Sequence, residues 1–182
     1  RFCTVQAPLG FTGSAVDGEV EDYLSAILEE EVDLDFGDAP DAPYQTLLAS
    51  DGARHVVVPG IYLGALIDAE ADGQPDATAT GDDLANLKDE DGVTFLNGWV
   101  AGQVATVQVV ASVSGIVSAW VDFDANGWWG DFGENVLAGT PVVAGTNVVV
   151  VSVPTSSNAV STFARFRFTT LPVAMTYTGL VA

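Results

Sequence analysis

The chain has 182 residues, of which 48% are hydrophobic and 16% charged, enough to bury a core as one domain or one domain plus part of another. Asp and Glu number 25 against 5 Lys and Arg, a net charge of −20 that rules against nucleic acid and anionic membrane partners, since both select Lys and Arg. One cysteine, Cys3, leaves no internal disulfide in this stretch, and without an apolar run of about 18 residues we expect no membrane insertion.

Runs of β-branched and aromatic residues separated by Gly, Asp and Asn dominate the chain, and helical periodicity is weak throughout. In one of these runs, Phe166 and Phe168 share one face while Arg165 and Arg167 share the other. Nine short strands with turn residues between them predict an all-β fold, an antiparallel β-sandwich of the immunoglobulin-like or jelly-roll type with long acidic loops. The predicted strands cover residues 19–28, 54–58, 61–67, 93–96, 103–112, 116–123, 146–153, 161–168 and 176–181.

Residues 29–43 are acidic and contain Pro40 and Pro43, which predicts an extended linker between two units. The β-sandwich domain is then expected at residues 44–182. Residues 1–28 are expected to be the terminal strands of a preceding repeat or a donor-strand segment.

The two ends of the chain are alike in sequence, which favours an array of repeats. Five residues recur at a constant offset of 166, namely Arg1, Phe2, Thr4, Thr12 and Gly13 as Arg167, Phe168, Thr170, Thr178 and Gly179. In such an array the partner of the Asp17–Tyr23 segment would follow residue 182. We therefore expect the sandwich to lack its last strand, and the next repeat or a neighbouring copy to supply it, because an open sheet edge invites pairing.

The acidic residues are clustered. All 25 lie between Asp17 and Glu134, and residues 92–121 and 135–182 contain none. A generally acidic surface would spread its carboxylates over every exposed face, whereas carboxylates gathered in a few loops repel one another unless a cation neutralises them. The distribution therefore predicts loops that bind Ca²⁺.

The sharpest cluster follows the predicted strand 116–123. Asp, Asp and Asn at alternate positions before a Gly resemble the start of a calcium loop, in which short side chains supply hard oxygens and Gly permits the sharp turn. An EF-hand is excluded because a strand precedes the loop and Glu134 stands one position beyond the twelfth. The alternative is a metal-free hairpin turn. The predicted ligands are Asp122, Asp124, Asn126, the backbone carbonyl of Trp128, Asp131 either directly or through water, and Glu134.

Two further groups of acids are weaker candidates. The first resembles a calcium loop but fits a disordered, solvated loop as well; its candidate ligands are Asp68, Glu70, Asp72, Asp76, Asp82, Asp83, Asp89 and Asp91. The second, Glu19, Glu21 and Asp22, either completes one of these ion sites or faces solvent.

Several of these motifs resemble the GEVED domain of bacterial secreted and surface proteins, and they follow its order along much of the chain. The most specific is the hexapeptide Gly18–Tyr23, which stands here at the front of the chain, as expected when an array is cut out of phase. The resemblance implies an extracellular β-rich module of large multidomain proteins, without a defined activity. The other matching segments are residues 35–41, 81–83, 89–93 and 119–127.

Other chemistry finds little support. The single histidine, His55, lies at a strand end, and no catalytic order, zinc spacing or phosphate-binding glycine loop accompanies it. Paired carboxylates leave a hydrolase as a distant third hypothesis. The alternative to a structural role is a carbohydrate-binding module in which Trp128 and Trp129 stack on sugars, although the sequence favours both rings as plugs that pack the loop against the sandwich.

The sequence thus predicts a secreted or cell-surface structural or adhesive repeat, and not an enzyme. We expect Ca²⁺ to stabilise it, and its partners to be adjacent copies or repeats, joined into a fibre by strand complementation, with surface glycans as the alternative partner.

Overall fold

The structure is a computed structural model of the whole chain and describes residues 2, 4, 10–27, 31–81, 91–158 and 160–181. The chain divides into two units, Arg1–Glu31 and Val32–Ala182, and each is described by itself. In the first unit the described backbone is extended or turned, with one antiparallel bridge between Phe2 and Glu19. Among the described residues, no helix has the length and hydropathy of a membrane span.

The second unit is all-β and sandwich-like, as the sequence predicts. Its strands form three sheets with the orders β3-β4-β7, β6-β5-β8 and β1-β2-β9, and every pair is antiparallel except β2 with β9. The elements are β1 (Leu34–Phe36), the 3-10 turn η1 (Leu48–Ser50), β2 (Arg54–Val56), β3 (Val93–Phe95), β4 (Val104–Ala111), β5 (Gly115–Val121), β6 (Asn135–Val142), β7 (Gly145–Ser152), β8 (Ala164–Thr169) and β9 (Leu180–Val181).

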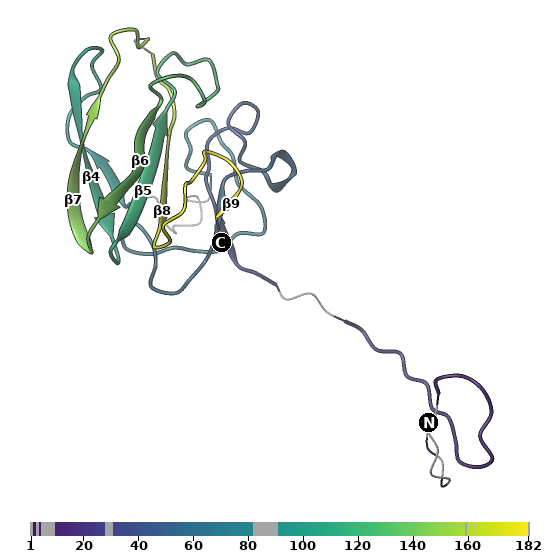
Figure 1. Cartoon of the computed structure of the whole chain (residues 1–182). Coiled ribbons are helices and arrows are strands. Elements are labelled where there is room, and N and C mark those ends of the chain that lie inside the picture. Colours follow the sequence, from purple (N-terminus) through teal and green to yellow (C-terminus); the bar gives the residue numbers. More distant parts are fainter. Residues whose placement is uncertain are drawn as a thin grey trace. The chain divides into compact units, whose positions relative to one another are not determined.

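The core lies between the first two sheets, which form separate layers (Figure 1). Strand β4 alternates strictly between buried and half-exposed residues, as expected for a strand with one face in a core. Its buried valines, Val107 and Val109, pack in one cluster with Val117 of β5 and Phe168 of β8. Each fully buried valine stabilises the fold by roughly 1.5–3 kcal/mol. The buried face of β4 therefore contributes much of the free energy that holds the two sheets together.

The outer face of β8 is buried as well, because residues 39–55 and 175–181 cover it as a third layer. Phe166 and Phe168 face the core, and Arg165 and Arg167 face the third layer, as the alternation predicts. The Arg167 guanidinium donates to four carbonyl oxygens, at 2.8–2.9 Å, and to His55 Nε2 at 3.0 Å. The carbonyls belong to Arg54, Thr176, Thr178 and Gly179. Arg167 therefore ties β8 to β2 and to the segment before β9.

His55 makes the stability of this layer depend on pH. It accepts the bond from Arg167, so its Nε2 carries no proton, and burial together with the Arg167 charge lowers the pKa of His55 from 6.5 to about 3. The unfolded chain therefore binds more protons than the folded chain between these values, and stability present above pH 6.5 is lost as the pH falls.

Between pH 7 and pH 5 we expect His55 to account for a loss of about 1–2 kcal/mol in the free energy of unfolding. The loss is measured by urea denaturation of the wild type and of His55→Gln, whose amide oxygen still accepts from Arg167 but does not titrate. Equal losses in both proteins would show that His55 titrates normally.

The structure differs from the predicted elements at several places, among them the predicted strand 176–181, of which only Leu180–Val181 forms a strand. The predicted strand 61–67 makes only one bridge, Leu63 to Ala111, because the chain turns at Gly64, whose φ is +78°. Strand β6 was not predicted, since Gly139 and Pro141 are poor strand formers. Among described residues of the predicted strand 19–28, only Glu19 makes a bridge.

The expected linker 29–43 also differs from the structure. From Val32 onward the chain belongs to the second unit, and Leu34–Phe36 forms β1, which pairs antiparallel with β2. The acidic composition suggested a solvated segment, but Phe36 and Ala39 are buried, so their apolar contacts outweigh that tendency.

Candidate metal centre

The calcium loop predicted at residues 122–134 connects β5 to β6. Asp122 follows β5 directly and Glu134 directly precedes β6. The Val121 N–H donates to the Glu134 carbonyl oxygen at 2.9 Å, so the strand pairing continues to the base of the loop. This pairing brings the first and last predicted ligands together although they are distant in sequence.

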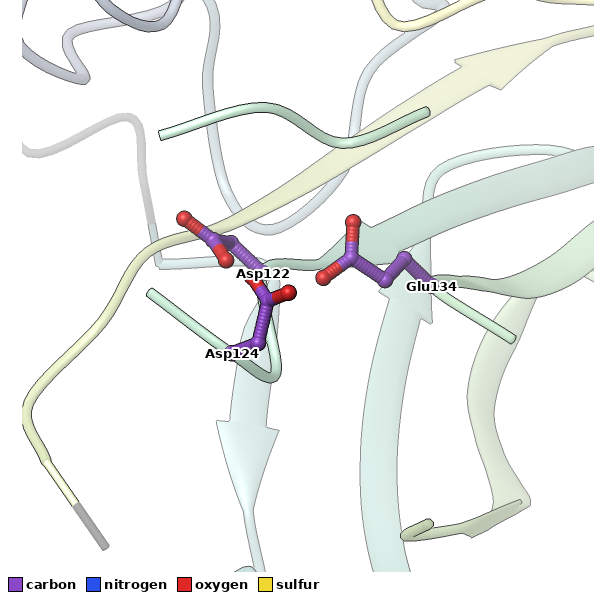
Figure 2. A group of neighbouring side chains, drawn as sticks. All are labelled: Asp122, Asp124 and Glu134. Atoms are coloured by element: carbon purple, nitrogen blue, oxygen red, sulfur yellow. The ribbon is translucent and has the colours of Figure 1, made fainter. Parts of the chain in front are cut away.

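Three carboxylates converge at the base of this loop. Asp122, Asp124 and Glu134 each offer an oxygen, and these oxygens all lie within 4.8 Å of one another (Figure 2). Asp122 is fully buried and Glu134 is 3% exposed, whereas Asp124 is exposed to solvent. Two of the three negative charges are therefore removed from water, which is costly unless they are neutralised.

Hydrogen bonds hold Asp122 firmly. Its Oδ2 accepts from the Tyr44 hydroxyl at 2.6 Å and from the Gly127 N–H at 2.8 Å, and its Oδ1 accepts from the Asn126 N–H at 3.1 Å. Tyr44 is a site residue that the sequence analysis missed, because it lies 78 residues away in the chain beside the expected linker. Burial and the bond to Asp122 raise the Tyr44 pKa to about 12, so Tyr44 stays a neutral donor.

Glu134 is only half satisfied. Its Oε1 accepts from the Phe123 N–H at 2.9 Å, whereas its Oε2 is buried without a hydrogen-bond partner. Burial, and then the charges of Asp122 and Asp124, raise the pKa of Glu134 to about 7. Arg54 and Asp51 form an ion pair elsewhere in the fold, and among the described residues no cationic side chain forms one with this cluster.

The remaining predicted ligands of this loop surround the three carboxylates. The Asn126 side-chain amide donates to Asp131 at 2.6 Å and to Asp124 at 3.2 Å, and its oxygen accepts from the Trp128 N–H. Asn126 therefore links the two aspartates, and Asp131 stands outside the converging group. Gly127 is required here, because its φ is +87° and a Cβ would lie 2.6 Å from Pro43.

The two adjacent tryptophans have different environments. Trp129 is buried, with its ring 4.5 Å from the Tyr44 ring and under the Arg165 guanidinium, also at 4.5 Å. Trp128 is half exposed, and its indole N–H donates to the Tyr177 hydroxyl at 2.8 Å. Burial of Trp129 leaves only Trp128 to contact a sugar, so the pair forms no shared stacking platform.

Four acids of the second group accept separate backbone hydrogen bonds, whereas Asp68 Oδ1 is buried without a hydrogen-bond partner. Asp76 accepts from Thr78 N–H at 2.7 Å and Thr80 N–H at 3.1 Å, and these bonds lower its pKa. Backbone N–H groups also donate from Leu48 and Gly73 to Asp72, from Phe36 to Glu70 and from Ala65 to Asp91. Asp82, Asp83 and Asp89 lie outside the described residues. Within the described ranges, no group of three potential ligands includes the other acids predicted as ligands, which are Asp68, Glu70, Asp72, Asp76 and Asp91 of the second group and Glu19, Glu21 and Asp22 of the first unit.

Comparison of the chain with protein-family models, with curated proteins and with solved structures gave no match.

Proposed function

We propose that this chain is a calcium-stabilised structural module of an extracellular tandem-repeat protein. The observation that carries the proposal is the Glu134 Oε2 atom, buried without a partner beside Asp122 and Asp124. Nearly all buried polar atoms have a hydrogen-bond partner, and a carboxylate oxygen without one, next to two further carboxylates, is the environment of a cation ligand.

The donor set favours Ca²⁺. The converging ligands are carboxylate oxygens only, which hard cations prefer, whereas Zn²⁺ and Cu²⁺ favour imidazole or thiolate. Ca²⁺ takes about 6–8 oxygens in flexible geometry, and a loop that offers both buried and exposed carboxylates suits this better than the strict octahedron of Mg²⁺. Dissociation constants of extracellular modules are about 10⁻⁴–10⁻³ M, which suits the calcium of extracellular fluids.

The repeat proposal has support from backbone conformation. Gly13 and Gly179, which correspond at the offset of 166 residues, both have positive φ, at 86° and 75°. Gly179 lies just before β9, which pairs parallel with β2. In an array, the equivalent of the Asp17–Tyr23 segment would continue from β9 and extend that sheet, which is the strand complementation that we propose between units. The resemblance to the GEVED domain agrees with this arrangement.

Terbium binding tests the metal site, because Tb³⁺ accepts the same hard oxygen ligands and emits when nearby aromatic rings are excited. Tyr44 bonds to Asp122 and lies 4.5 Å from Trp129, so both rings are placed to sensitise an ion in the loop. We expect terbium emission that excess Ca²⁺ displaces. Glu134→Gln, which keeps the shape of the side chain and removes its buried charge, should weaken binding at least about tenfold.

The matched control is Asp76→Asn, which also exchanges a carboxylate for an amide but in a turn that accepts backbone bonds. It should leave terbium binding unchanged. Absence of calcium-displaceable emission, or equal effects of the two substitutions, would refute a calcium site at residues 122–134.

A further inference from the structure

Among the described residues, no strand pairs with the edge of β7 that faces away from β4. Strand β7 pairs with β4 along its whole length of 8 residues and stands last in the sheet order β3-β4-β7. Figure 1 shows β7 beside β4. Val153, just beyond it, both donates to Gln103 and accepts from Gly102 on the β4 side. Because antiparallel strands alternate the direction of these groups, the N–H and C=O groups of Thr146, Val148, Val150 and Ser152 face away from β4.

The open edge of β7 lacks the features by which proteins protect such edges, which include proline, charge and bulges. Strand β6, at the edge of the facing sheet, has two of them, Pro141 and register shifts in its pairing with β5, together with a positive φ at Gly139. The sequence of β7, Gly-Thr-Asn-Val-Val-Val-Val-Ser, contains no proline and no charge. Val148 and Val150 are 60% and 62% exposed on its outer face.

The charge of the chain is absent from this side of the sandwich. Residues 92–121 and 135–164 contain no Asp, Glu, Lys or Arg, although the net charge is −20. On the strands β3 to β8 the only charged side chains are Arg165 and Arg167, and both are buried. Two copies of a protein with this charge repel each other at most orientations, and the strands β3 to β7, which carry no charged side chain, are where they approach at the least electrostatic cost.

We propose that β7 pairs antiparallel with β7 of a second copy of this chain, so that the two β3-β4-β7 sheets become one continuous sheet. A two-fold axis at Val149 places Val148 opposite Val150 of the second copy and Thr146 opposite Ser152. The backbone N–H and C=O groups that face away from β4 then all form hydrogen bonds with the second copy. A second copy fits better than a charged partner, because this surface has no charge to complement. The contact is separate from the calcium loop and from the proposed joint at β9, and goes beyond both.

Sedimentation velocity over a hundredfold range of protein concentration tests this contact. We expect a dimer that dissociates on dilution. Val150→Pro removes an outward-facing N–H that the fold itself does not use, and should raise the dissociation constant of the dimer at least about tenfold. Val150→Lys keeps the backbone donor but places two like charges close to each other across the axis. It should therefore also raise the dissociation constant of the dimer.

The control is Val173→Lys, which adds the same charge at a valine 40% exposed in the loop after β8, the strand at the edge away from β6. It should leave the dimer unchanged, and thermal melting should show that all variants are folded. A wild type that stays monomeric at every concentration overturns the proposal. So does a dimer that both Val150 variants leave intact.

Discussion

Chelation of calcium is expected to lower the midpoint of thermal unfolding by about 5–10 °C. A ligand present at 100 times its dissociation constant adds about 2.7 kcal/mol to the folded state, and about 1 kcal/mol shifts the midpoint of a domain of this size by roughly 2–4 °C. The physical reason is the repulsion between the buried carboxylates of Asp122 and Glu134, which is outweighed by the attraction of each to a bound cation. The measurement is a melting curve in calcium and in EDTA.

Asp124→Ala should remove most of this calcium-dependent shift. Asp124 is exposed, so in EDTA the substitution should change the free energy of unfolding by only about 0.5 kcal/mol. In calcium the effect should be larger, because the cation loses one of its three converging carboxylates. Asp76→Asn should keep the full shift. A wild-type melt that is the same in calcium and in EDTA would rule out stabilisation by calcium, whatever the variants do.

Arg167→Met is expected to lower the free energy of unfolding by about 3–5 kcal/mol, the largest effect of any single substitution proposed for this chain. The substitution keeps the packing of the long side chain but removes donors to four backbone carbonyls and to His55. These acceptors lie between β8 and the third layer, where water does not replace the lost bonds without opening that layer. Urea denaturation followed by tryptophan fluorescence measures the loss.

Arg54→Met is the matched control for Arg167. Arg54 also carries a guanidinium in the third layer, but its side-chain partners are Asp51, which is exposed, and the carbonyl of Gly52 two residues away. An ion pair of this kind contributes about 0–1 kcal/mol, so Arg54→Met should cost far less. Similar losses in both variants would show that the Arg167 bonds do not hold the third layer to the sandwich.

Local sequence patterns predicted the parts of the fold that rest on neighbouring residues. The alternation in β4 placed its buried face correctly, because a strand in contact with a core has a period of two residues. The same rule separated Phe166 and Phe168 from Arg165 and Arg167. It did not predict that the arginine face is buried, because the carbonyls that Arg167 contacts belong to residues elsewhere in the chain.

The acidic groups show the same limit. Spacing within the Asp122–Glu134 loop predicted a cluster whose first two acids converge with its last one. A similar spacing of acids around Asp72 and Asp76 also resembles a calcium loop, but in the structure these two side chains accept hydrogen bonds from separate backbone N–H groups. The two cases differ in a pairing that no local pattern contains, in which β5 and β6 close the ends of one loop on each other.

The sequence by itself determined the fold class, the acidic loop at residues 122–134 and the charge-free strands, because composition and short-range periodicity encode them. Only the tertiary structure decided that Asp122 and Glu134 are buried together and that Glu134 Oε2 lacks a partner. It also decided that the Tyr44 hydroxyl donates to Asp122 and that, among the described strands, β7 lies at the edge of its sheet. Burial and edge position depend on which distant segments cover a residue, and long-range packing sets that arrangement.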